Sequence, residues 1–115
     1  MMKRKLLLLV CTLFSMKALA SSGYIALEVE ITSVANTGAN AKSFTVKTAN
    51  GSGLCSGETI TFPLALSGND GHNEGIHNRA YSAALMALST GKLVSIFSYD
   101  DASFCNRAAY IEVFK

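Results

Sequence analysis

The segment 99–106 places an aromatic ring beside a group of polar side chains, a pattern that is typical of a shallow carbohydrate site. Its members are Tyr99, Asp100, Asp101, Ser103 and Asn106. A tyrosine ring offers a flat apolar surface with a solvated hydroxyl at its tip. The chain has no tryptophan, so the aromatic platforms that it offers are Tyr24, Tyr81, Tyr99 and Tyr110. The alternative is ordinary packing of these tyrosines on strands.

Two histidines and several carboxylates gather in the glycine-rich segment 68–77. His72 and His77 lie five residues apart with Glu74 between them, so they could share a metal ion if the segment folded back. Their spacing matches neither a helical i, i+4 pair nor a known zinc signature. Asn, Asp and Gly residues of this kind also form solvated turns. We expect a solvated loop here, with no metal ion and no cofactor.

Residues 53–57 read Gly-Leu-Cys-Ser-Gly, which has the G-x-C-x-G form of a nucleophile elbow. That elbow requires a strand that runs into a helix, whereas the residues after Cys55 are β-rich and end at Pro63. Two pairs of carboxylates also occur, at Glu28 with Glu30 and at Asp100 with Asp101. Nothing in their spacing indicates a shared cleft. We therefore expect a protein that is not an enzyme.

The first twenty residues have the three parts of a secretory signal peptide. Residues 3–5 are positively charged, 6–14 are apolar, and 18–20 form a small-residue cleavage site of the A-x-A kind. The apolar part is too short to span a bilayer. We expect cleavage after Ala20, no membrane span, and a secreted or periplasmic mature chain with one domain over 21–115.

Cleavage after Ala20 changes both the cysteine count and the charge. It leaves Cys55 and Cys105, and two cysteines in an exported domain most simply form one disulfide. It also removes four basic residues, so that six Lys and Arg stand against eight Asp and Glu, a net charge of −2. This balance gives no basic surface, and we expect no nucleic-acid partner.

Five strands and one helix can be placed from hydrophobic periodicity and turn residues. The expected strands span 24–34, 43–49, 54–62, 93–99 and 107–114, and we expect the third of them to be broken near Gly57. The expected helix spans 76–90 and ends before Gly91. In the first strand we expect Leu27 on the apolar face and Ala26 on the polar face. The order β-β-β-α-β-β matches a five-stranded OB-type Greek-key barrel with one helix between its third and fourth strands. A two-layer α+β sandwich is the main alternative.

The expected helix is apolar over most of its circumference. One stripe is rich in alanine and consists of Ile76, Ala80, Ala83, Ala84 and Ala87. A second stripe, about 120° further round, consists of Tyr81, Leu85 and Leu88. The alanine stripe suits a helix that plugs a small barrel. The second stripe needs a cover, which either the same chain or a second subunit supplies.

Several of these motifs together resemble those of the OB-fold binding subunits of AB5 toxins of the subtilase cytotoxin and typhoid toxin kind. They are Phe44-x-Val46, Cys55, the run AYSxALxALSTGKLVSI over 80–96, and Cys105. The chain is also similar to small exported bacterial proteins of unknown function that share this helix, the Thr-Gly-Lys step and the following strand. The resemblance implies a secreted, non-enzymatic barrel that assembles as a ring, often a pentamer, and binds cell-surface glycans. It carries over no glycan-contact residue.

Three hypotheses for the function follow. The first is a secreted or periplasmic, non-enzymatic and oligomeric binding module that resembles a toxin B subunit and binds glycans. The second is a monomeric exported protein that binds another protein, as an inhibitor or an envelope protein does. The third is a small hydrolase or metal protein that uses the segment 72–77. We favour the first, with Tyr99 and its polar neighbours as the ligand site and with Tyr81, Leu85 and Leu88 as the interface.

Overall fold

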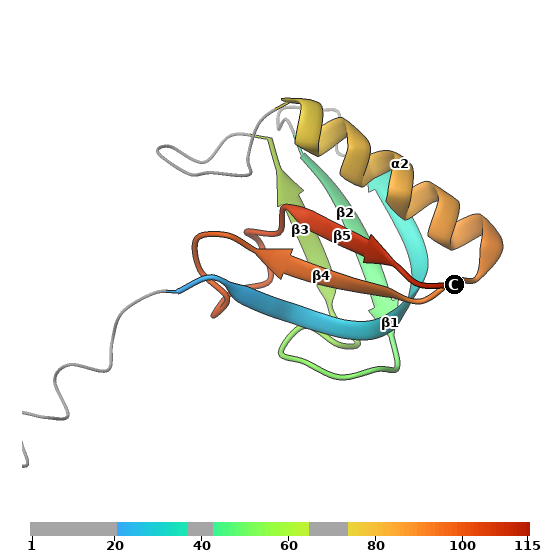
Figure 1. Ribbon diagram of the computed structural model, residues 1–115, viewed down its shortest axis with the longest axis horizontal. Helices are drawn as coiled ribbons and strands as arrows, with labels where there is room; N and C mark the ends of the chain where they lie inside the picture. Colours follow the sequence, from blue (N-terminus) through green and yellow to red (C-terminus); the bar gives the residue numbers. More distant parts are fainter. Residues whose placement is uncertain (1–20, 37–42, 65–73) are drawn as a thin grey trace, which may run out of the picture.

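The computed structural model describes residues 21–36, 43–64 and 74–115. In chain order its elements are β1 (Gly23–Asn36), β2 (Ser43–Ala49), β3 (Thr59–Pro63), α2 (Glu74–Thr90), β4 (Val94–Ser98) and β5 (Tyr110–Val113) (Figure 1). This confirms the predicted order, with a helix between the third and fourth strands. The expected signal peptide, residues 1–20, lies outside the described residues.

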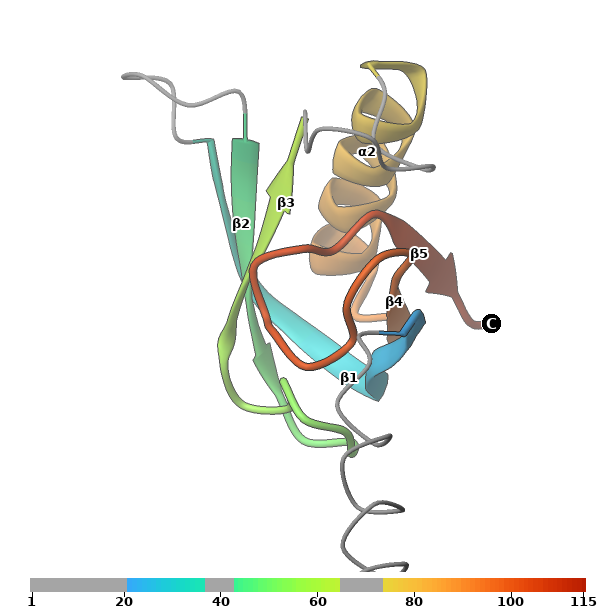
Figure 2. The ribbon, with the colours of Figure 1, turned by 90° about the vertical axis from the view of Figure 1, so that its left-hand side faces the viewer.

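The five described strands form one antiparallel sheet in the order β3-β2-β1-β4-β5, and this sheet curls until β3 lies beside the segment that precedes β5. The Thr61 N–H of β3 donates to the Cys105 carbonyl (2.8 Å), and the Ala108 N–H donates to the Thr61 carbonyl (3.2 Å). These bonds join β3 to the segment that leads into β5, which closes the barrel in the OB order rather than forming a flat layer. Figure 2 shows β2 and β3 on one side, β4 and β5 on the other, and β1 bending between them.

The bend in β1 changes which side chains face the core. Its first part pairs with β4 and its last part with β2, with register shifts on both sides of Ala26, and Glu28 has a positive φ of 50°. A bulge inserts a residue and so shifts the alternation of faces. Ala26 is consequently buried beside Ile25, while Leu27 is exposed. The predicted placement of Ala26 and Leu27 is therefore wrong.

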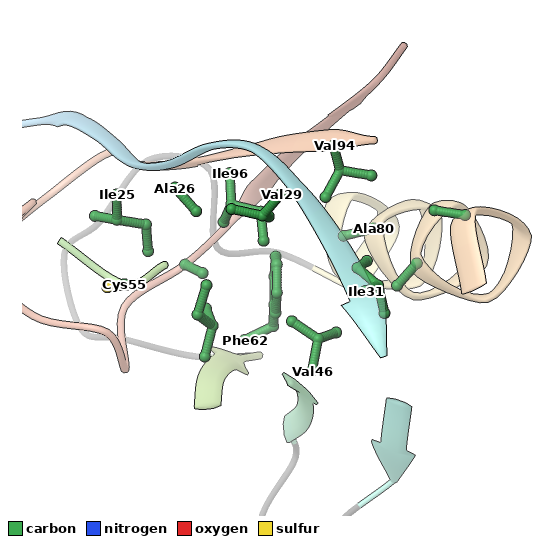
Figure 3. Packing of buried hydrophobic residues seen from close by; sticks show 14 of the residues in the cluster. Ile25, Ala26, Val29, Ile31, Val46, Cys55, Phe62, Ala80, Val94 and Ile96 are labelled. Carbon is green, nitrogen blue, oxygen red and sulfur yellow. The ribbon is translucent and has the colours of Figure 1, made fainter. Parts of the chain in front are cut away.

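The core fills the space between the curled sheet and one face of α2 (Figure 3). Its larger members are Ile25, Val29, Ile31, Phe44, Val46, Ile60, Phe62, Val94 and Ile96. The helix packs against β1 and β5, and its buried residues are Ala80, Ala84 and Ala87, which confirms the centre of the predicted alanine stripe. Small side chains at a contact allow a helix to approach closely, so α2 fits against this short barrel.

The helix begins two residues earlier than expected and ends where the sequence indicates. Its first residue is Glu74 and its last is Thr90. Gly91 then takes a φ of +74°, and its N–H donates to the Ala87 carbonyl at 2.9 Å. This is the left-handed C-terminal position that glycine adopts without steric cost. No helix in the described part of the chain is long and apolar enough to cross a membrane.

The turn after β2 docks against the bend in β1. Leu27 and Ser52 exchange two backbone hydrogen bonds of 2.8 and 3.0 Å, and the Cys55 N–H donates to the Ile25 carbonyl at 2.8 Å. Because the backbone groups of this turn bond to β1, they do not pair with β2. β3 therefore begins only at Thr59. The expected third strand over 54–62 is therefore wrong in its first part.

Cys55 and Cys105 form the predicted disulfide, with their Cα atoms 5.7 Å apart. Cys55 is fully buried. The bond joins the turn between β2 and β3 to the connection between β4 and β5, close to the backbone bonds that close the barrel. A disulfide of this kind is compatible with the predicted secreted or periplasmic location.

Candidate functional site

Four aromatic rings gather on the outer face of β1, β4 and β5. The register places Tyr24 opposite Phe97 and Phe97 opposite Tyr110, and directly opposed residues project to the same side of a sheet. Ring centroids are 5.0 Å apart for Tyr24 and Phe97 and 6.3 Å apart for Phe97 and Tyr110. Tyr99 adds a fourth ring, 5.1 Å from Phe97. We call these four residues the aromatic face.

The three tyrosines of the aromatic face are open to solvent. Their exposed fractions are 46% for Tyr24, 43% for Tyr99 and 37% for Tyr110, and Phe97 between them is half-buried. The Tyr24 hydroxyl lies 3.5 Å from a carboxylate oxygen of Glu112. Desolvation, followed by the charge of Glu112, raises the pKa of Tyr24 above its ordinary value. The phenol therefore keeps its proton at neutral pH and donates toward this carboxylate.

The two carboxylates next to Tyr99 form hydrogen bonds that stabilise the loop in which they lie. Asp100 accepts hydrogen bonds from the Ser98 hydroxyl (3.2 Å) and from the Arg107 guanidinium (2.7 Å), and Asp101 accepts one from the Ser103 N–H (2.9 Å). Burial raises the pKa of Asp100, but the hydrogen bonds from Arg107 and Ser98 outweigh it and leave this pKa below its ordinary value. Asp100 is thus ionised at neutral pH, with its charge matched by Arg107.

The structure brings Tyr99 together with Tyr24 and Tyr110, which lie far apart in the sequence. Tyr24 and Tyr110 could be named from the sequence as aromatic platforms, but their position beside Phe97 depends on strand register, which no local pattern contains. Ser103 and Asn106 are exposed in the same connection between β4 and β5. The predicted polar residues therefore lie in the connection that begins at Tyr99, and Asp100 and Asp101 stabilise that connection through their hydrogen bonds.

A cleft of about 470 Å³ lies between α2 and β5. Tyr99 and Tyr110 line it together with Ile76, Arg79, Ala83 and Ile111. Arg79 is the charged member of this lining, and in the part of the chain that the structure describes it has no ion-pair partner. The sequence indicated only a solvated polar arc of the helix at Arg79. Arg79 lines a cleft only because the fold brings β5 beside the helix.

The second stripe of the helix is divided. Tyr81 is half-buried, and its ring centroid lies 5.1 Å from that of Phe44. Leu85 and Leu88 are 41% and 39% exposed, and the neighbouring Met86 is exposed as well. The chain therefore covers Tyr81 by itself and leaves the leucines open.

The remaining motifs provide neither a grouped set of metal ligands nor a free Cys55 thiol among the described residues. His72 lies outside them, and His77 packs edge-on against Phe44 with its Nε2 atom 3.1 Å from the Phe62 carbonyl oxygen. Within residues 21–36, 43–64 and 74–115, no three His, Cys, Asp or Glu side chains are grouped to hold a metal ion. The G-x-C-x-G motif presents no thiol, because Cys55 is bonded to Cys105.

Comparison with protein families gives a match over nearly the whole chain. The model of DUF5992, a family of unknown function, matches residues 5–115. No curated protein and no solved structure matches the chain. The similarity to small exported proteins of unknown function is compatible with this result, which adds no support for a relation to toxin B subunits. The chain belongs to the DUF5992 family.

Proposed function

We propose that this protein is an exported, non-enzymatic binding module that holds a glycan on its aromatic face. The observation that carries the proposal is the convergence of three exposed tyrosine rings around Phe97. Exposed apolar clusters of this kind mark binding surfaces. The apolar face of a sugar ring packs against aromatic rings, and tyrosine adds a hydroxyl for the sugar's own hydroxyl groups.

The surroundings of the aromatic face suit a polar, ring-shaped ligand. The Tyr24 hydroxyl and the Glu112 carboxylate provide a donor and an acceptor beside the rings, and the exposed Ser103 and Asn106 lie in the connection that follows Tyr99. The rings stand on three paired strands, and the disulfide ties the loop to the barrel. A preorganised surface loses less entropy when it binds, which favours recognition by a shallow site.

Removal of a tyrosine ring should weaken glycan binding. We expect the mature wild-type chain to bind a subset of glycans on an array, and we expect Tyr99→Ala and Tyr110→Ala each to lower the affinity for the best of them at least ~10-fold. Titration calorimetry with that glycan measures the change. Phe104→Ala removes an exposed ring outside the aromatic face and serves as the matched control. An array without signal above background, or tyrosine variants that bind like the wild type, would contradict the proposal.

We also propose that the module is oligomeric and that the open part of α2 forms the subunit contact. Leu85, Met86 and Leu88 form an exposed apolar surface on this helix. Leu85 and Leu88 are 41% and 39% exposed, so burial of the remainder contributes about 1 kcal/mol each. A glutamine amide buried there without a partner adds a further cost, so two polar replacements should dissociate the assembly. Light scattering at micromolar concentration should give a multiple of the mature chain mass for the wild type and a single chain mass for Leu85→Gln with Leu88→Gln. Leu54→Gln, at an exposed leucine outside α2, is the control. A wild-type chain that is monomeric at this concentration refutes the contact.

A further inference from the structure

β5 carries backbone groups that no described strand pairs. Antiparallel ladders alternate between hydrogen-bonded and non-bonded positions. The Phe114 N–H donates to the Leu93 carbonyl at 2.9 Å, so every second residue of β5, counted back from Phe114, bonds to β4. The N–H and C=O groups of Ile111 and Val113 therefore point away from β4, and no backbone group of the described residues bonds to them on that side.

The other edge of the sheet is closed at the centre of β3 and ends at a proline. β3 bonds to residues 105–108 through both backbone groups of Thr61, and it ends at Pro63, which has no N–H to donate. Among the described strands, the open pairing edge is thus the segment of β5 that contains Ile111 and Val113.

The cleft between α2 and β5 lies beside this open edge. Ile111 contributes to its lining from the strand, and Ile76, Ala83 and Arg79 contribute from the helix. Among the described residues, the cleft therefore combines outward backbone groups of β5, an apolar lining and one positive charge without an ion-pair partner. An extended polypeptide satisfies all three features, because its backbone pairs with the edge while alternate side chains enter the cleft.

We propose that this cleft binds an extended, acidic segment of another polypeptide as a strand added to β5. The positive charge of Arg79 favours a negatively charged partner, because a carboxylate on the cleft side of the added strand would form an ion pair with it. Small apolar side chains beside that carboxylate fit against Ala83 and Ile111. This interaction is additional to the proposed glycan site, and the two surfaces share only Tyr99 and Tyr110.

A second copy of the chain fits this edge poorly. A symmetric pairing of two β5 strands that uses both Ile111 and Val113 places Glu112 directly opposite the same residue of the second copy. Like charges at directly opposed positions of an antiparallel pair are destabilising. The edge is also only four residues long, so a bound partner must draw part of its affinity from the cleft. The partner chemistry is therefore that of a foreign acidic strand.

A library of random linear peptides displayed on phage, selected on the immobilised mature chain, tests the proposal. We expect enriched peptides to carry Asp or Glu within an otherwise small and apolar stretch. Synthetic copies should lose at least ~10-fold in affinity for Arg79→Glu and for Ala83→Trp, which fills the cleft, and less than ~3-fold for Arg79→Lys. Tyr24→Ala, on the aromatic face but outside the cleft, should leave peptide affinity unchanged. The peptide result can therefore be judged independently of the glycan proposal.

Amide hydrogen exchange gives an independent readout of strand addition. With a saturating selected peptide, the Ile111 and Val113 amides should exchange at least ~10-fold more slowly, because they gain hydrogen-bond partners. The proposal would be overturned if the selected peptides bound the Arg79→Glu variant as tightly as the wild type, or if the Ile111 and Val113 amides stayed unprotected in the complex. Protection that rises with protein concentration in the absence of peptide would instead assign the edge to a second copy and would equally overturn it.

Discussion

Replacement of Cys55 and Cys105 together by alanine is expected to lower the free energy of unfolding of the domain over residues 21–115 by about 4 kcal/mol. The two cysteines are 50 residues apart, and loss of the bond returns the entropy of that loop to the unfolded chain. The bond also joins the β2–β3 turn to the segment that closes the barrel. Since small domains have total stabilities of about 5–15 kcal/mol, the variant should be close to unfolding at 37 °C. Urea unfolding followed by circular dichroism measures the difference.

Reduction of the wild type provides the control for this experiment. The reduced wild-type chain and the double alanine variant both lack the cross-link, so their unfolding midpoints should agree closely. The remaining difference is that the reduced chain keeps the buried Cys55 side chain, which alanine does not fully replace in volume. If the double variant lost less than about 1 kcal/mol, the loop-closure argument for this disulfide would be refuted.

Gly51→Ala is expected to lower the free energy of unfolding by about 3 kcal/mol. Gly51 has a φ of +70°, and an added Cβ would lie against the Leu27 carbonyl oxygen and 2.6 Å from the Glu28 carbonyl oxygen. These atoms belong to the backbone at the bend of β1, so they cannot move aside as a flexible side chain would. The variant must either distort the bend or detach the turn from β1. Urea unfolding of Gly51→Ala against the wild type gives the size of the effect.

Gly57→Ala is a matched control because it carries the conformational cost without the collision. Gly57 has a φ of +79°, and an added Cβ would meet nothing within 4 Å. We expect this variant to lose only about 1 kcal/mol, the cost of a left-handed conformation for alanine. Equal losses for the two variants would show that the collision of the added Cβ with β1 contributes nothing to the destabilisation of Gly51→Ala.

The sequence predicts well those features that depend on neighbouring residues. The alanine positions of α2 repeat with helical spacing, and Gly91 marks the end of the helix, so both could be placed without tertiary information. The bend at Glu28 was missed because neither its type nor its neighbours signal a positive φ. The strand expected from residue 54 was too long because the bonds between Cys55 and β1 compete with strand pairing there.

The sequence by itself determined the element order, the helix with its alanine face, and the cysteine pair. Tertiary structure alone decided that Tyr24, Phe97 and Tyr110 stand side by side, that Arg79 belongs to a cleft, and that β5 has an open edge. Periodicity and turn residues act over a few positions of the chain. Register and strand edges arise from pairing between segments that are distant in sequence, and here the bulges in β1 reset that pairing in a way that no local pattern specifies.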